Sequence, residues 1–326
     1  MKTQVLSTSG ERDFAGKRAV ESLSAGQAIA LPTETVYGLA ADALNPEAVL
    51  RIFEAKERPR FDPLIVHLPE SAWLPRLASV HAGERELIEA LMERFWPGPL
   101  TLVLSRLEQV PDVVTAGLET VAVRMSAHPV FGEIIRAFGR PLAAPSANRF
   151  GRISPTTAAH VLAELDGRIP LIVDDGPTAH GLESTIVAVR DGRIEILRHG
   201  PITEEQLAVL AETRPAIERE RPEAPGQLRS HYAPRTSLVL MADISSLVPP
   251  AGQKVGALTL RNRPRGAFAE SRILSRSGDL REAAANLFRC LRELDQAGLD
   301  LIAAEEIPEA GLGAAIMDRL RRASAR

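Results

Sequence analysis

A hairpin signal near the middle of the chain constrains the fold most. Two apolar runs, Ile186 to Val189 and Ile194 to Leu197, flank a turn that contains Asp191-Gly192. An Asp-Gly pair between two β-forming runs is typical of a tight turn, because both positions tolerate a positive φ. The segment therefore predicts two antiparallel strands, and it commits part of any sheet in this chain to antiparallel pairing.

Short apolar runs alternate with helical patterns over residues 14–212. Runs bounded by turn residues indicate buried strands, and apolar residues three and four positions apart indicate helices. Besides the hairpin strands, Thr185 to Val189 and Ile194 to Leu197, the predicted strands are Ala28 to Leu31, Leu64 to Leu68, Leu100 to Leu104, Val121 to Met125, Leu142 to Ala144 and Leu171 to Val173. The predicted helices are Phe14 to Leu23, Pro46 to Ala55, Glu84 to Phe95, Val130 to Phe138, Thr156 to Leu165 and Glu204 to Glu212. We expect an α/β fold with a large, twisted sheet of mixed parallel and antiparallel strands.

A segment rich in proline and charge divides the chain. Residues 213–235 lack a sustained apolar period, which is typical of a linker. Beyond it, strands are predicted at Leu238 to Met241, Val255 to Leu260, Ile273 to Leu274 and Leu299 to Ala304, and helices at Leu280 to Leu294 and Leu312 to Arg322. We therefore predict a first domain over 1–212, a linker over 213–235 and a small C-terminal α/β domain of Rossmann-like type over 236–326.

Composition narrows the function classes. The formal net charge is −3, so the chain lacks the general basic surface that broad RNA binding needs. A single cysteine, Cys290, excludes an internal disulfide and a cysteine-rich metal site, and it fits a reducing compartment. Met1 to Arg12 lacks the apolar stretch of a signal peptide, and no long apolar run predicts a membrane span. We expect a cytoplasmic protein that makes no contact with membranes.

Two polar segments suggest a site for a polyanion. Lys56-Glu57-Arg58-Pro59-Arg60 places three cations in five positions, and Pro145-Ser146-Ala147-Asn148 offers a hydroxyl and an amide. Arginine binds phosphate oxygens through two parallel hydrogen bonds, and lysine acts as a compact charge. Lys56 is the only lysine between positions 18 and 253, which favours a specific role. The alternative is a solvated charge at the end of a helix.

Other polar residues follow predicted strands. Residues 32–39 place hydroxyls and a carboxylate in a loop, although Thr33 or Thr35 could instead cap a helix. His67 ends an apolar run and could be an ordinary core histidine. Arg124 also ends such a run, so it requires an anionic partner, for which a substrate carboxylate would serve. In the linker, Tyr232 could stack on a base or bind a phosphate if the linker closes as a lid over a cleft.

Several catalytic signatures are absent from the sequence. It contains no P-loop, no dinucleotide-binding glycine fingerprint, no zinc-protease histidine pair and no nucleophile elbow. No residue stands out as a covalent nucleophile. The site is therefore better suited to positioning reactants and stabilising charge than to covalent catalysis.

Seven ordered motifs carry a resemblance to a known family. They are Pro32-Thr33-Glu34-Thr35-Val36-Tyr37-Gly38-Leu39, Lys56-x-Arg58-Pro59, Pro63-Leu64-Ile65-Val66-His67, Trp96-Pro97-Gly98-Pro99-Leu100-Thr101, Val123-Arg124, Pro145-Ser146-Ala147-Asn148 and Glu183-Ser184-Thr185-Ile186. In this order they resemble the threonylcarbamoyl-AMP synthases with a YrdC-like domain. The resemblance extends through His231-Tyr232-Ala233-Pro234 to the C-terminal residues 311–320 and indicates the long, two-domain form.

The resemblance implies a reaction and a set of site residues. L-threonine, bicarbonate and ATP would give L-threonylcarbamoyladenylate and pyrophosphate, the first step of threonylcarbamoyladenosine formation in tRNA. The implied catalytic residues are Lys56, Arg58, Ser146 and Asn148. The implied ATP contacts are Arg58, Asp62, Thr120, Ser146, Ser154, Arg198, His231 and Tyr232. The implied threonine contacts are Thr35, His67, Arg124, Ala144 and Ser184.

The resemblance also implies Mg²⁺ as cofactor, bound through the phosphates without a direct protein ligand. The implied downstream partner is the machinery that transfers threonylcarbamoyl to tRNA, and a weak direct contact with tRNA stays open. Asp62 departs from the family, which often has asparagine there, so it would repel a triphosphate unless it binds magnesium or pairs with Arg60. Two alternative functions stay open: a module that binds structured RNA without ATP turnover, and a carbamoyltransferase of the hydrogenase-maturation type.

Overall fold

The computed structural model describes residues 2–217, 222–228, 231–250 and 252–325. Arg221, Arg229 and Ser230 of the predicted linker lie outside these ranges. The chain divides into two compact units. The first unit comprises 1–150, 155–178 and 183–227, and the second comprises 151–154, 179–182 and 228–326. Each unit contains one of the two sheets.

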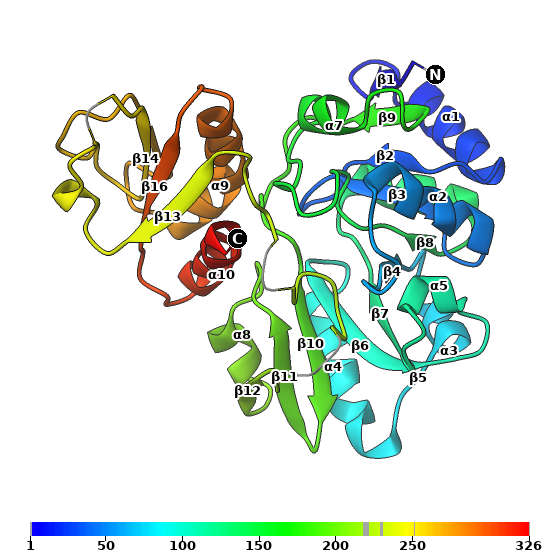
Figure 1. The fold of residues 1–326 in the computed structure, drawn as a ribbon. Helices are drawn as coiled ribbons and strands as arrows, with labels where there is room; N and C mark the ends of the chain where they lie inside the picture. The colour runs from blue at the N-terminus through cyan, green and yellow to red at the C-terminus, as the bar shows by residue number, and fades with distance from the viewer. Residues whose placement is uncertain (1, 218–221, 229–230, 251, 326) are drawn as a thin grey trace. The chain divides into compact units, whose positions relative to one another are not determined.

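The first unit is built on a large mixed sheet, as the sequence predicts (Figure 1). Its strand order is β1-β9-β2-β3-β8-β4-β7-β6-β10-β11-β12, and β5 pairs with β6 outside this path. The strands are β1 (Gln4–Ser7), β2 (Ile29–Leu31), β3 (Gly38–Asp42), β4 (Ile65–His67), β5 (Ala78–Ser79), β6 (Leu100–Arg106), β7 (Thr120–Arg124), β8 (Leu142–Ala143), β9 (Leu171–Asp174), β10 (Thr185–Arg190), β11 (Arg193–Arg198) and β12 (Thr213–Pro215). The sheet contains both parallel pairs, such as β4 with β7, and antiparallel pairs, such as β6 with β7.

The predicted hairpin is confirmed. β10 and β11 pair antiparallel around Asp191 and Gly192, which have φ values of 54° and 72°. Positive φ at both turn positions matches the twist of the two strands. The hairpin continues the sheet beyond β6, because β10 runs parallel to β6 with Thr185 opposite Leu100.

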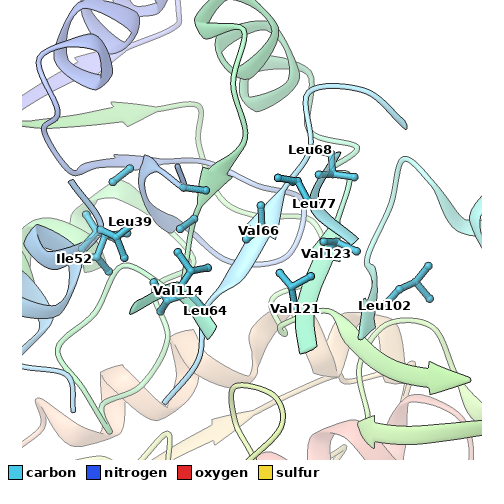
Figure 2. Packing of buried hydrophobic residues seen from close by; sticks show 14 of the residues in the cluster. Leu39, Ile52, Leu64, Val66, Leu68, Leu77, Leu102, Val114, Val121 and Val123 are labelled. Atoms are coloured by element: carbon cyan, nitrogen blue, oxygen red, sulfur yellow. The ribbon is translucent and has the colours of Figure 1, made fainter. Parts of the chain in front are cut away.

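One face of the sheet packs against the main core. Helices α2 (Pro46–Lys56), α4 (Arg85–Phe95) and α7 (Ala158–Leu165) contribute to this core. From the sheet, Val66, Leu102 and Val123 point into it, and Figure 2 shows them among other buried residues of the cluster. They stand opposite one another on β4, β6 and β7. Since side chains alternate between the two faces of a sheet, the next residues along these strands face the other way.

The opposite face has two separate apolar clusters. One gathers residues of β2, β3 and β8 under helices α1 (Arg12–Ser24) and α6 (Pro129–Phe138). The other contains Ile65, Val103, Ala122 and Ile186 of β4, β6, β7 and β10, with Ala224 from the predicted linker packed among them. The apolar surface on this face is therefore interrupted, and the interruption leaves room for polar side chains.

The second unit contains a smaller, fully parallel sheet. Its strands are β13 (Ser237–Met241), β14 (Val255–Thr259), β15 (Glu270–Ile273) and β16 (Leu301–Glu305), in the order β13-β16-β14-β15. Helices α9 (Leu280–Asp295) and α10 (Leu312–Ser324) pack with it. This arrangement confirms the predicted small α/β domain.

Several elements were not predicted from the sequence. β1 lies in the polar N-terminal segment, and β3 occupies part of the stretch read as a ligand loop. The predicted linker begins with a strand, because β12 pairs parallel with β11. Helix α8 (Glu204–Ala208) ends earlier than predicted. No helix in the described part of the chain combines the length and apolar character that a membrane crossing needs.

Candidate active site

A row of polar side chains crosses three neighbouring strands in the first unit. His67 of β4 and Thr101 of β6 both stand opposite Arg124 of β7. Each lies two residues along its strand from a member of the apolar cluster on that face, and all three side chains are buried. Burying polar groups in a strand costs free energy unless they have partners or a function. The row is therefore the candidate substrate site.

Three groups of the protein contact the Arg124 guanidinium. Its Nε donates to the Gly98 carbonyl at 3.2 Å and its Nη1 to Thr35 Oγ1 at 3.1 Å. Its Nη2 lies 2.6 Å from Oε1 of Glu34, and both side chains are nearly inaccessible to solvent. The anionic partner expected for Arg124 is therefore Glu34 of the same chain. Glu34 lies in residues 32–39, the stretch predicted to be a ligand loop.

Glu34 is held in place by other groups besides Arg124. Ser126 Oγ and the Ala127 amide both donate to its carboxylate. Burial alone would raise the pKa of Glu34, but the Arg124 charge and these hydrogen bonds outweigh it and lower the pKa to about 2. The carboxylate is therefore ionised at neutral pH. Sequence reasoning placed Glu34 in the loop but gave it no role.

His67 is buried and neutral. Burial, with a smaller contribution from the Arg124 charge, lowers the pKa of His67 to about 3. Its ring lies 4.8 Å from that of Phe131 of α6, centroid to centroid. Its Nδ1 is buried and has no hydrogen-bond partner among the described residues. A neutral imidazole with an unused ring nitrogen suits a hydroxyl or amine ligand better than an anion.

The low pKa of His67 predicts an acid sensitivity that one substitution removes. Below a pH of about 6.5 the unfolded chain binds a proton at this residue, whereas the folded chain does not until about pH 3. We expect this histidine alone to cost roughly 2 kcal/mol of unfolding free energy between pH 6.5 and pH 5. Urea titrations at pH 7.5 and pH 5 should show a smaller pH effect in His67→Asn than in the wild type. Equal pH effects in both proteins would contradict the burial of a neutral His67.

A second polar network joins Ser184, Thr101 and Arg198. Ser184 Oγ lies 2.8 Å from Thr101 Oγ1 and accepts from Arg198 Nη2 at 3.0 Å. Arg198 also donates from Nε to the Ser184 carbonyl and from Nη1 to the Pro225 carbonyl, at 3.0 and 3.1 Å. The last residue of β11 thus reaches the same polar row, and Pro225 of the predicted linker accepts a hydrogen bond from it. Thr101 is a second buried residue of the site that sequence reasoning did not select.

The Lys56 side chain connects the two predicted polyanion segments. Helix α2 begins at a cap in which Asn45 accepts from the Glu47 and Ala48 amides, and its last residue is Lys56, before Glu57 in a left-handed conformation. Lys56 Nζ donates to the Asn148 carbonyl at 2.6 Å and also to the Ser146 carbonyl. The lysine is 1% exposed, and burial together with the Arg58 charge holds its pKa well below the ordinary value. The reading of Lys56 as a solvated charge at a helix end is therefore wrong.

Arg58 and Asp62 form a buried ion pair. Arg58 Nη2 lies 2.8 Å from Asp62 Oδ2, and Arg58 also donates to the carbonyls of Asp62 and Pro63. Burial raises the pKa of Asp62 in spite of the nearby Arg58 and Lys56 charges. Asp62 is 0% exposed. Arg58 therefore balances the charge of Asp62, in place of the Arg60 or magnesium ion that the sequence suggests.

The remaining predicted residues fall in both units. Thr120 begins β7, at the opposite end of that strand from Arg124, and Ala144 follows β8 and is 7% exposed. Ser154, His231 and Tyr232 belong to the second unit. There the Tyr232 ring lies 5.7 Å from the Phe288 ring and 5.1 Å from Arg319 Cζ, and Tyr232 has a φ of 62°. The roles assigned to these residues stay predictions.

Metal ligands do not gather in the described residues. No group of three or more histidine, cysteine, aspartate or glutamate side chains there could hold a metal ion. Asp62, which follows the cationic segment Lys56 to Arg60, is already paired with Arg58.

Comparisons with known proteins identify two family models that together span most of the chain. The model described as telomere recombination matches residues 21–200, and the C-terminal domain model of threonylcarbamoyl-AMP synthase matches residues 202–325. The threonylcarbamoyl-AMP synthase of Pyrococcus abyssi (strain GE5 / Orsay) is 41% identical over 316 residues, which is 92% of this chain and 91% of that protein. The enzyme of the same name from Bacillus subtilis (strain 168) is 41% identical over 322 residues, covering 94% and 92%.

A solved structure extends the likeness to three dimensions. The crystal structure of P. abyssi Sua5 complexed with L-threonine superposes with a TM-score of 0.86 at 38% sequence identity. The match covers 99% of this chain and 98% of that chain. The fold of both units is therefore shared with that protein.

Proposed function

The chain belongs to the two-domain family of threonylcarbamoyl-AMP synthases, and from that premise we propose that its polar row binds L-threonine while the segments joined by Lys56 bind ATP. It is an enzyme that forms threonylcarbamoyl-AMP from ATP for the modification of tRNA. This function decides against the two alternatives, an RNA-binding module without turnover and a hydrogenase-maturation carbamoyltransferase.

The row of His67, Thr101 and Arg124 carries the threonine proposal. Arg124 supplies the charge that an amino-acid carboxylate needs, and Thr35 and Ser184 supply hydroxyls beside it. The neutral ring of His67 provides a nitrogen for the threonine hydroxyl or amine, and Ala144 stays a predicted threonine contact. The P. abyssi protein forms a complex with L-threonine, which supports the presence of a threonine subsite.

The ATP proposal rests on the other end of the same strands. Thr120 begins β7 and Asp62 precedes β4, whereas Arg124 and His67 end these parallel strands. The four residue steps from Thr120 to Arg124 span roughly 13 Å, which separates a nucleotide subsite from an amino-acid subsite. Arg58, Ser146 and Asn148 would contact phosphates, and Lys56 would hold the carbonyls of residues 146 and 148 so that this segment keeps its shape. Arg198, which bonds Ser184, would contact the nucleotide from the threonine end of the sheet, and Asp62 would act through Arg58. The nucleotide contacts of Ser154, His231 and Tyr232 stay predictions.

The reaction requires little from the protein beyond the positioning of its substrates. The threonine amine attacks carbon dioxide and loses a proton, or attacks bicarbonate with loss of water, to give a carbamate. A carbamate oxygen then attacks the α-phosphorus of ATP. The bond from that phosphorus to the bridging oxygen breaks, and pyrophosphate leaves with the electron pair. Cations that spread the negative charge and fix the line of attack suffice for this displacement. ATP would enter with Mg²⁺ on its phosphates, and the ion would help pyrophosphate to leave.

The cellular setting follows the same proposal. We place the enzyme in the cytoplasm, where it hands its adenylate to the machinery that transfers threonylcarbamoyl to tRNA, with or without a weak direct contact with tRNA. We also propose that residues 1–212 form the catalytic domain, residues 213–235 the linker and residues 236–326 the C-terminal domain.

Pyrophosphate release tests the proposed function directly. Purified protein with ATP and Mg²⁺ should release pyrophosphate only when both threonine and bicarbonate are present. Omitting either substrate, or chelating magnesium, should reduce the rate to background. Serine and alanine in place of threonine provide matched controls, because each lacks part of the threonine side chain. Release that is independent of threonine would refute the proposal.

A further inference from the structure

Glu34 places a negative charge beside Arg124, the cation that the proposed function assigns to the threonine carboxylate. Its Oε1 lies 2.6 Å from Arg124 Nη2, so the charge of Arg124 is largely balanced before a substrate arrives. The carboxylate is fixed from three sides, by Arg124, Ser126 and Ala127. A substrate cannot push it aside without breaking these contacts in a buried environment.

The charge balance of the site has a chemical consequence. His67 is neutral, and Thr35, Thr101 and Ser184 are uncharged, so Arg124 and Glu34 are the two charges that face each other in the row, and Arg198 adds a cation on the Ser184 side. A ligand that carries only a carboxylate would meet Arg124 and Glu34 together and gain little. A zwitterion brings its ammonium group to the negative charge and its carboxylate to the positive one.

From this pairing we infer that Glu34 is a specificity-determining residue, which makes the site select the zwitterionic head group of a free amino acid over a simple carboxylate. The inference rests on the proposed threonine site and adds the reason for its preference. Glu34 acts through Arg124, whose fork it orients, and through its own charge, which favours the α-ammonium group. A carboxylate of similar shape without the amine is the natural competitor to be rejected.

The test compares threonine with 3-hydroxybutanoate, which is threonine without its α-amine. Calorimetry measures the Kd of each ligand for the whole protein, in the wild type and in Glu34→Gln. Two unit charges about 6 Å apart at an effective dielectric of about 20 interact strongly enough for at least a tenfold effect. We expect threonine to bind at least about tenfold more weakly to Glu34→Gln and 3-hydroxybutanoate to bind more tightly. Opposite changes for two ligands cannot come from a general loss of structure.

Two further variants serve as controls. Glu133→Gln on α6 removes the same charge from an exposed ion pair with Arg12 of α1. This variant should leave both Kd values unchanged. Glu34→Asp keeps the charge and should stay closer to the wild type than Glu34→Gln in the ratio of the two Kd values. If Glu34→Gln fails to fold, Ser126→Ala loosens the carboxylate without changing its charge and should shift the ratio in the same direction by a smaller factor.

The outcomes separate this inference from the proposed function. An unchanged Kd ratio in Glu34→Gln overturns the inference, even if the wild type releases pyrophosphate with threonine and bicarbonate. Absence of threonine binding to the wild type would instead overturn the threonine site itself. A parallel weakening of both ligands would show that Glu34 only supports the structure, which also overturns the inference.

Discussion

Arg58→Ala should reduce adenylate formation at least about 10³-fold, since an arginine that stabilises charge in phosphoryl transfer contributes on that scale. The same change leaves Asp62 buried without its ion-pair partner. Breaking a buried pair in this way destabilises a protein by about 3 to 5 kcal/mol, although the raised pKa of Asp62 lets it take up a proton and limits the cost. Pyrophosphate release and the thermal unfolding midpoint measure the two effects separately.

The double variant Arg58→Ala/Asp62→Asn distinguishes an effect on the catalytic rate from an effect on stability. Asparagine has the shape of aspartate without its charge, so the double variant should recover most of the lost unfolding temperature. Its rate should stay as low as that of Arg58→Ala. Recovery of both rate and stability would mean that Arg58 serves only to neutralise Asp62 and that the nucleotide is bound elsewhere.

Arg124→Ala should raise the KM for threonine by about 10- to 100-fold, because a charge-assisted hydrogen bond to a carboxylate contributes about 1.5 to 3 kcal/mol. The KM for ATP should stay within a factor of about two, since Arg124 lies at the far end of β7 from Thr120. Initial rates over a grid of threonine and ATP concentrations give both constants. Arg106→Ala, at the end of β6 and paired with Asp112, is the matched control and should change neither.

Removing Arg124 also leaves Glu34 as a buried charge without its cation. The double variant Arg124→Ala/Glu34→Gln should therefore unfold at a higher temperature than Arg124→Ala while its threonine KM stays high. An Arg124→Ala enzyme with an unchanged threonine KM would place the amino acid away from the polar row.

Much of the fold follows from local sequence patterns. The hairpin around Asp191-Gly192 and the amphipathic helices were predictable because turn chemistry and apolar spacing are local properties. Strand β3 was not, because Gly38 to Asp42 contains glycine, alanine and a buried aspartate, and these residues become a strand only by pairing with β2 and β8. β12 likewise forms by pairing with β11, in a segment whose composition indicates a linker.

The residues of the candidate site were easier to predict than the contacts between them. Motif matching selected Arg124 and His67, and the strand register then placed them opposite each other. It did not select Glu34 or Thr101, since their importance comes from partners more than sixty residues away in the chain. A buried cation in an apolar strand does imply an anion nearby, and that argument applied to the neighbouring motifs could have found Glu34. The carbonyl partners of Lys56 had no signal in the sequence, because a main-chain oxygen belongs to every residue.

The hydrogen bond from Arg198 to the Pro225 carbonyl has an evolutionary consequence, because its acceptor is also a main-chain oxygen. What this stretch of chain contributes to the arginine is an oxygen atom that any amino acid would supply. Selection would then act on the position of the main chain at Pro225 and would leave the identity of the side chain there largely free. In related enzymes, substitutions at this position should therefore be more frequent than deletions of it.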